Sequence, residues 1–292
     1  MSVPEADGVR PAHLRKPVLQ DAAFLADVKT GARNDGHFRL WWLGQSGFLL
    51  AWRDLFALLD PYLSDSLTKK YAGTNQPHVR ITERVVDPSA LDFIDVTISS
   101  HSHTDHLDPE TLRALLNANP RMLLVVPSAT AVICAERIGV PMSRLSTIDE
   151  GLTLSMGAFD ITGVASAHEK LEYDEKGNCR FLGYLLRFGG WTIYHAGDTV
   201  DYPGLAEKLR KFNVDVALLP INGRGRGVPG NLSGAEAAQL ARRMGARLAV
   251  PCHYDMFEFN TVDPSEFCTA AAACGQPCVI LSVGGRCESL KR

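Results

Sequence analysis

The sequence lacks the features that mark several large classes of protein. No apolar run approaches the roughly 20 residues that a helix needs to cross a bilayer. The 30 basic residues nearly balance the 33 acidic ones, which gives a net charge of −3. This balance suggests neither a nucleic acid nor a membrane surface as a partner. The sequence also contains no short-period repeat and no low-complexity tract.

Paired cysteine spacing is missing as well. The seven cysteines are an odd number, and the closely spaced pair Cys274 and Cys278 has no second half, so a zinc ribbon is not indicated. We expect reduced, mostly buried thiols in a cytoplasmic protein. Residues 1–7 are polar and acidic, and we therefore expect no secretory signal there.

What is present is a pattern of alternating strands and helices. Hydrophobic residues make up 46% of the 292 residues, enough for a sizeable core. We expect an α/β domain over residues 38–292, with residues 1–37 as an N-terminal extension packed on it. Strands are predicted over 38–44, 48–52, 55–59, 93–99, 122–126, 145–148, 152–154, 159–164, 184–188, 191–195, 214–219, 247–251 and 279–282. Helices are predicted over 21–29, 109–118, 129–138, 203–212, 233–245 and after residue 263.

The most informative segment follows the predicted strand over 93–99. It carries four potential metal ligands within six positions: His101, His103, Asp105 and His106. The next residues, 108–110, read Asp-Pro-Glu, which is typical of a helix start. A short loop of imidazoles and a carboxylate is thus held between a strand and a helix. Such a loop suits zinc, manganese or iron, although a solvated histidine tract is the alternative.

Three further candidates also follow predicted strands. His168 and His253 can each reach the first loop if their strands end at the same edge of the fold. Asp198 follows Gly197, whose small size allows a close backbone approach, and its carboxylate suits a ligand shared by two metals. Strand alternation turns His195 away from the metal, so we assign it to packing or to the support of a ligand.

Asp60 ends the third predicted strand and is followed by proline. It could orient a metal-bound histidine, because ligating imidazoles usually donate their other N–H to a carboxylate. A plain Asx-Pro turn is the alternative. The aperiodic segment 64–90 is expected to form a lid or a wall of the site. Within it, His78 is expected at the surface and not as a ligand.

Another strand exit carries Arg224 and Arg226, which are spaced by glycines. Arginines in a flexible loop at this place could bind an anionic group of a substrate. A solvated loop with no ligand is the alternative for this segment.

The ordered set of His-x-His-x-Asp-His, His168, Gly-Asp198-Thr and His253 resembles the metallo-β-lactamase superfamily over about residues 38–290. The segments 42–47 and 59–61 fit its first strands. The resemblance implies a four-layer αββα sandwich with two divalent metal ions. It places His101, His103 and His168 on one ion and Asp105, His106 and His253 on the other, with Asp198 bridging them.

Within this superfamily, residues 215–224 and 250–255 look most similar to the L-ascorbate 6-phosphate lactonase group. The resemblance implies hydrolysis of a sugar-acid-like or phosphorylated cyclic ester, with a small anionic molecule as substrate. A homo-oligomer is also reasonable by this resemblance. We expect Asp105 to transfer a proton and His253 to complete the catalytic site.

Substrate contacts are expected from four residues beyond the metal ligands. Arg224 or Arg226 would bind the anionic group, and Asn222 or Tyr254 would position the ring. A small-molecule phosphodiesterase with the same two metals is the second hypothesis. A non-catalytic metal-binding protein is the third.

Overall fold

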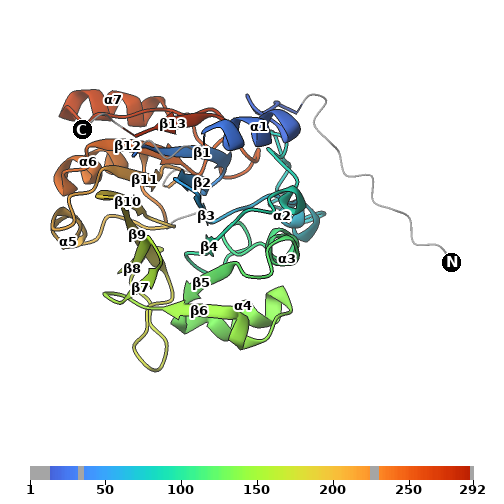
Figure 1. Cartoon of the computed structure of the whole chain (residues 1–292). Helices are drawn as coiled ribbons and strands as arrows, with labels where there is room; N and C mark the ends of the chain where they lie inside the picture. Colours follow the sequence, from blue (N-terminus) through green and yellow to red (C-terminus); the bar gives the residue numbers. More distant parts are fainter. Residues whose placement is uncertain (1–13, 32–35, 224–229, 290–292) are drawn as a thin grey trace.

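Two β-sheets form the centre of the molecule, and helices cover their outer faces (Figure 1). The computed structural model describes residues 14–31, 36–223 and 230–289. The two sheets share one hydrophobic core. Phe38 of the first sheet packs edge to face against Phe188 and Trp191 of the second, with ring centroids 5.8 and 5.2 Å apart. Such aromatic contacts hold the two sheets together at this end of the interface.

The first sheet has seven strands: β1 (Phe38–Gly44), β2 (Gly47–Trp52), β3 (Leu55–Leu59), β4 (Val96–Ile98), β5 (Leu123–Pro127), β6 (Leu145–Ile148) and β13 (Arg286–Glu288). Their order is β13-β1-β2-β3-β4-β5-β6. Pairing is antiparallel from β13 to β3 and parallel from β3 to β6. The hairpins predicted over 38–59 are confirmed. The strand predicted over 93–99 is confirmed as the shorter β4.

The second sheet has six strands: β7 (Thr153–Met156), β8 (Phe159–Ala165), β9 (Leu182–Phe188), β10 (Trp191–His195), β11 (Val216–Pro220) and β12 (Leu248–Cys252). Their order is β12-β11-β10-β9-β8-β7. Strands β10, β11 and β12 run parallel. The strand predicted over 279–282 is wrong, because this segment forms no ladder; residue 278 makes only an isolated bridge to Ala249. The described chain instead closes with β13 against β1.

The helices are α1 (Asp21–Gly31), α2 (Ser66–Lys70), α3 (Pro109–Ala118), α4 (Ala131–Ile138), α5 (Leu205–Arg210), α6 (Gly234–Met244) and α7 (Ser265–Cys274), with 3-10 turns at Pro88–Ala90, Ser128–Thr130 and Met142–Arg144. Helices α1 to α4 lie on one side of the sheets and α5 to α7 on the other (Figure 1). The predicted four-layer αββα arrangement is therefore confirmed. In the described ranges, none of the helices has the length and apolar content of a membrane span.

Two helix starts that frame the site follow from local sequence. Asp108 caps α3 by accepting hydrogen bonds from the N–H groups of Glu110 and Thr111, as predicted. Ser233 and Glu236 form the predicted capping box of α6. At the other end of the chain, α1 adds Phe24 and Val28 to the common core. The division at residue 37 remains a prediction.

Candidate metal centre

The loop that joins β4 to α3 carries four of the seven predicted ligands. Its start is fixed by the Ser99 N–H, which donates to the Val125 carbonyl of β5 at 2.9 Å. Its end is fixed by a turn in which the Leu107 N–H donates to the His103 carbonyl at 2.7 Å, just before the capped helix. Because both ends are tied to rigid elements, the loop holds its side chains in place with little conformational freedom.

The other three predicted ligands follow strands of the second sheet. His168 comes after β8, Asp198 after β10 and His253 after β12. Since β10 and β12 both run parallel to β11, their carboxyl ends lie at the same edge. Gly197 has φ +59°, and a Cβ added there would lie 2.7 Å from Ser100 Cβ. The close approach predicted at this glycine is thus present, and it brings Asp198 against the first loop.

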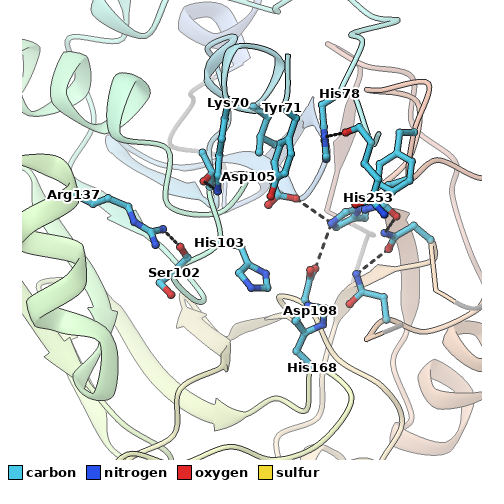
Figure 2. A pocket seen from close by; sticks show the side chains of 17 residues that line it. Lys70, Tyr71, His78, Ser102, His103, Asp105, Arg137, His168, Asp198 and His253 are labelled. Carbon is cyan, nitrogen blue, oxygen red and sulfur yellow. Dashed lines mark hydrogen bonds and ion pairs between the residues drawn. The ribbon is translucent and has the colours of Figure 1, made fainter. Parts of the chain in front are cut away.

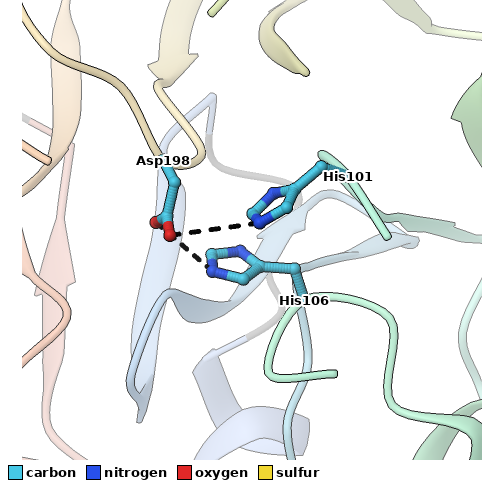
Figure 3. Close-up of side chains that lie close together, drawn as sticks. All are labelled: His101, His106 and Asp198. Carbon is cyan, nitrogen blue, oxygen red and sulfur yellow. Dashed lines mark ion pairs between the residues drawn. The ribbon is translucent and has the colours of Figure 1, made fainter. Parts of the chain in front are cut away.

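All seven predicted ligands come together in three groups. The ligand atoms of each group lie within 4.8 Å of one another: His101, His106 and Asp198; His103, His168 and Asp198; Asp105, His106 and His253. Figure 3 shows the first group, in which both imidazoles face the same carboxylate. The second predicted ligand set appears as one group. The three histidines of the first set are divided between two groups, and Asp198 belongs to both.

The short distances run between imidazoles and carboxylates. Nε2 of His106 lies 3.3 Å from Asp198 Oδ1 and 3.6 Å from Asp105 Oδ2. Nε2 of His253 lies 3.3 Å from Asp105 Oδ2 and 3.5 Å from Asp198 Oδ1. Nε2 of His101 lies 4.0 Å from Asp198 Oδ2. The five side chains therefore surround a small common volume.

Unpartnered buried atoms indicate that this volume fits a cation. Within the described residues, Nε2 of His101, Nε2 of His106 and Oδ1 of Asp198 are inaccessible to solvent and form no hydrogen bond. Leaving such atoms unsatisfied costs about 1–3 kcal/mol each. Imidazole nitrogens and carboxylate oxygens are ligands of divalent first-row metals, which would satisfy all three atoms at once.

The charges of the site are strongly coupled. Burial alone would raise the pKa of Asp198, but His106 and His253 beside it hold that pKa well below its ordinary value. Burial would likewise lower the pKa of His253, yet Asp198 and Asp105 raise it to about 9. For His101, burial and the neighbouring His106 push the pKa well below its ordinary value. The site is thus poised to exchange protons for metal ions.

Asp60 supports the loop between β4 and α3 through hydrogen bonds to its carboxylate. Its carboxylate, which is fully buried, accepts hydrogen bonds from His106 Nδ1 at 2.7 Å and from His195 Nε2 at 2.8 Å. It also accepts from the N–H of Ser100 at 2.7 Å and from its hydroxyl at 2.6 Å. The orienting role proposed for Asp60, and the supporting position of His195, agree with this geometry. A plain Asx-Pro turn does not account for it.

Two further supports were not found from the sequence. His168 Nδ1 donates to the carbonyl of Gly230 at 2.9 Å, which leaves Nε2 for a metal. Gln45 donates from its side-chain Nε2 to Asp105 Oδ2 at 3.0 Å, and its backbone carbonyl accepts from the backbone N–H of His253 at 2.8 Å. Gln45 sits in the turn between β1 and β2 with φ +50°, and nothing in its neighbourhood predicts this contact.

A pocket of about 230 Å³ opens onto the predicted ligands. Figure 2 shows His103, Asp105, His168, Asp198 and His253 facing it. The segment 64–90, predicted as a lid or wall, contributes one wall through residues of α2 and the turn after it. His78 lies in this wall, stacked on Tyr71 at 4.4 Å, and it belongs to none of the three groups.

The predicted substrate contacts have mixed outcomes. Asn222 lines the pocket; its side-chain amide donates a hydrogen bond to Asn260 and accepts one from Asn231. Arg224 and Arg226 lie outside the described residues. The prediction that Tyr254 contacts the substrate is wrong, because this residue does not line the pocket in the described part of the chain.

The reason is packing. Tyr254 is 2% exposed, its ring lies 4.7 Å from Trp42, and its hydroxyl donates to the Leu281 carbonyl. His253 has φ +67°. Because neighbouring side chains in an extended or turning segment point to different sides, the residue after His253 is directed into the core.

Comparison with known proteins agrees with this geometry. The family described as "Beta-lactamase superfamily domain" matches residues 39–253. A protein of Escherichia coli O127:H6 named "Probable L-ascorbate-6-phosphate lactonase UlaG" is 25% identical over 263 residues, covering 79% of this chain and 73% of that protein.

Solved structures share the fold. A metallo hydrolase from Ignicoccus hospitalis superposes with a TM-score of 0.64 at 18% identity, covering 88% of this chain and 100% of the other. An isothiocyanate hydrolase from Delia radicum gut bacteria gives a TM-score of 0.67 at 18% identity, covering 85% and 98%. On the family match and the ordered ligands that the fold assembles, the chain is a member of the metallo-β-lactamase superfamily of metal-dependent hydrolases.

Proposed function

We propose that this hydrolase holds two divalent ions and opens a cyclic ester of a small anionic metabolite. The observation that carries the proposal is the position of Asp198, a buried carboxylate common to two groups of potential ligands. A carboxylate has two oxygens and can therefore serve two ions, whereas a single ion would use only one of the two ligand groups that contain Asp198. The lactonase named among the relatives supports the ester as the reacting bond.

The protein residues divide the work around the metal pair. Bound divalent ions supply Lewis acidity and lower the pKa of water towards neutrality. Asp105 holds a carboxylate oxygen within 3.3 Å of His253 Nε2 and faces the pocket, where it can accept a proton and return it to the leaving oxygen. Asn222 lines the same pocket, and the hydrogen bonds to Asn231 and Asn260 hold its amide in place, with the second N–H of Nδ2 left for the substrate ring.

The volume of the pocket and the net charge of the chain favour a small molecule as the substrate. Its volume of about 230 Å³ lies below the ~300–1,000 Å³ of typical drug-sized pockets. The overall charge of −3 gives no support to a polyanionic substrate such as a nucleic acid. Zinc and manganese are the first candidates for the metals, and iron is a third.

The test is a substrate panel assayed with zinc-loaded and manganese-loaded protein. Hydrolysis of lactones, small phosphodiesters and β-lactams is compared by proton release. The metal content per chain is measured in parallel and is expected to be two. Asp198→Asn is expected to abolish lactone hydrolysis and to lower the metal content. Asp201→Asn, three residues away and paired with Arg243, is the matched control and keeps both.

Phosphodiester turnover without any lactone turnover would reverse the assignment in favour of the second hypothesis. A protein that holds two metals and hydrolyses no member of the panel would support the non-catalytic hypothesis.

A further inference from the structure

Two cationic side chains line the pocket beside the predicted metal ligands. They are Lys70, at the end of α2, and Arg137, in the last turn of α4. Among the described residues that line the pocket, these are the only lysine and arginine. They come from helices more than 60 positions apart in the sequence. Their presence in one pocket is therefore a product of the fold.

Both cations are anchored to the ligand loop. Lys70 Nζ donates to Thr104 Oγ1 at 3.3 Å, and Arg137 donates to the carbonyl of Ser102. Ser102 and Thr104 flank His103, so the two cations approach this predicted ligand from its two neighbours. Figure 2 shows Lys70 and Arg137 on one side of the labelled ligands and His253 on the other.

Neither cation has a carboxylate partner among the described residues. The neighbouring Lys69 is different, because it pairs with Glu110 at 2.9 Å and does not line the pocket. Lys70 contacts only a hydroxyl and the face of Tyr71, 5.1 Å from the ring centroid. Both cations are exposed at the pocket and can therefore contact a bound molecule. An anion that lies between them would be attracted by both charges.

We propose that Lys70 and Arg137 form the subsite for a phosphate monoester group carried by the substrate. The proposal rests on the proposed function, whose anionic metabolite it specifies. A phosphate monoester carries a charge of about −1.5 to −2 at neutral pH, which matches two cations better than a carboxylate does. The guanidinium of Arg137 offers paired donors, and Lys70 adds a compact charge. The reacting ester then lies towards Asp198 and the phosphate towards α2 and α4.

The experiment uses three lactones of one ring size that differ in a single substituent: a phosphate monoester, a carboxylate or a hydroxyl. In the metal-loaded enzyme, Lys70→Ala and Arg137→Ala are each expected to raise KM for the phosphorylated lactone about tenfold. The KM for the hydroxyl lactone and the metal content are expected to stay unchanged. Lys69→Ala and Arg144→Ala, which remove cations outside the pocket, are the matched controls.

A role of these side chains in holding the loop would give a different pattern. Loss of the Ser102 or Thr104 contact would lower metal content and raise KM for all three lactones alike, and that result would overturn the proposal. Arg137→Lys keeps a donor for Ser102 and is expected to recover part of the affinity for phosphate. An equal effect on the carboxylate lactone would replace the phosphate by a general anion and so reject the class proposed here.

A binding measurement separates this inference from the proposed function. A phosphorylated cyclic ether, which has no ester to cleave, is titrated calorimetrically into the metal-loaded protein and the variants. Tight binding that weakens about tenfold in Lys70→Ala supports the subsite even if no lactone is hydrolysed. Lactone hydrolysis without any preference for the phosphorylated substrate contradicts the subsite and leaves the proposed function standing.

Discussion

The carboxylate of Asp60 accepts a hydrogen bond from His106 Nδ1 at 2.7 Å, and neither side chain has any exposed surface. An ionised carboxylate only accepts, so Nδ1 of this imidazole carries the proton. Nε2 of His106 is consequently the nitrogen that faces Asp198, and it is the one that would give up its proton when a metal ion binds. The pair therefore determines which nitrogen faces the metal centre.

We expect Asp60→Asn to weaken metal binding about 10- to 100-fold. The Asp60 carboxylate accepts hydrogen bonds from Ser100, His106 and His195. An asparagine amide has only one oxygen, so its NH₂ group would face some of these donors and could not accept from them. The measurement is a competition titration of zinc against a chelator. Asp65→Asn, which loses the ion pair between an exposed carboxylate and the buried Arg80 away from the predicted ligands, is the control and should keep wild-type affinity. Unchanged affinity in Asp60→Asn would show that His106 orients itself without this carboxylate.

Gly230→Ala should remove the contribution of His168. Gly230 has φ +119°, and a Cβ added there would lie 2.1 Å from His168 Nδ1. Its carbonyl is also the acceptor for that nitrogen. Because the imidazole of His168 and the backbone at residue 230 cannot both keep their positions, we expect the variant to lose about one of the two proposed metal ions. Metal content per folded chain, measured by atomic emission, tests this expectation.

The matched control for this variant is Gly245→Ala. Gly245 also has a left-handed backbone, with φ +78°, but nothing lies within 4 Å of the added Cβ. The substitution should cost about 1 kcal/mol of stability and leave the metal content intact. If both variants lose metal equally, backbone strain and not contact with His168 is responsible.

The sequence predicted the parts of the site that depend on local order. The ligand loop after β4, the cap at Asp108 and the strand exits before His168, Asp198 and His253 were all visible as short patterns. Strands that run parallel in one sheet end at the same edge, so the sequence already indicated that the residues after these strands would lie close together.

The parts that could not be predicted depend on contacts between distant segments. Gln45 reaches Asp105 across 60 positions, and its left-handed backbone gives no pattern that indicates such a contact. Lys70 and Arg137 look like ordinary surface cations of α2 and α4. Tyr254 was misplaced because a polar aromatic beside a ligand fits a binding site and a core equally well.

Tyr254 is expected to contribute to stability and not to substrate binding, because it is buried against Trp42. Tyr254→Phe keeps the ring against Trp42 and removes only the hydroxyl that donates to Leu281 at 3.3 Å. We expect kcat and KM to stay within twofold of wild type and stability to fall by about 1 kcal/mol. Steady-state kinetics on the preferred lactone, together with urea unfolding, measure both. A rise of KM by tenfold or more would restore Tyr254 to the substrate site.

Removal of the metal should make the stability of the fold depend on pH through His253. In the metal-free protein, burial would lower the pKa of His253, but Asp198 and Asp105 raise it to about 9, above the ~6.5 of an unfolded chain. A raised pKa in the folded state stabilises the fold fully below about pH 6.5, and this contribution is lost as pH rises towards 9. We therefore expect the Tm of chelator-treated protein to fall across this window.

Metal binding should respond in the opposite direction, because a ligating imidazole must be neutral. The difference in Tm between zinc-loaded and metal-free protein is expected to grow from pH 6.5 to pH 8.5, and zinc titration at pH 7 should release about two protons, from His106 and His253. The pKa of His106 is also held well above its ordinary value: burial would lower it, but Asp198 raises it. Scanning fluorimetry measures the first effect and a pH indicator the second. His253→Gln should remove a large share of both, whereas a Tm difference that is constant with pH would contradict the protonated state of the empty site.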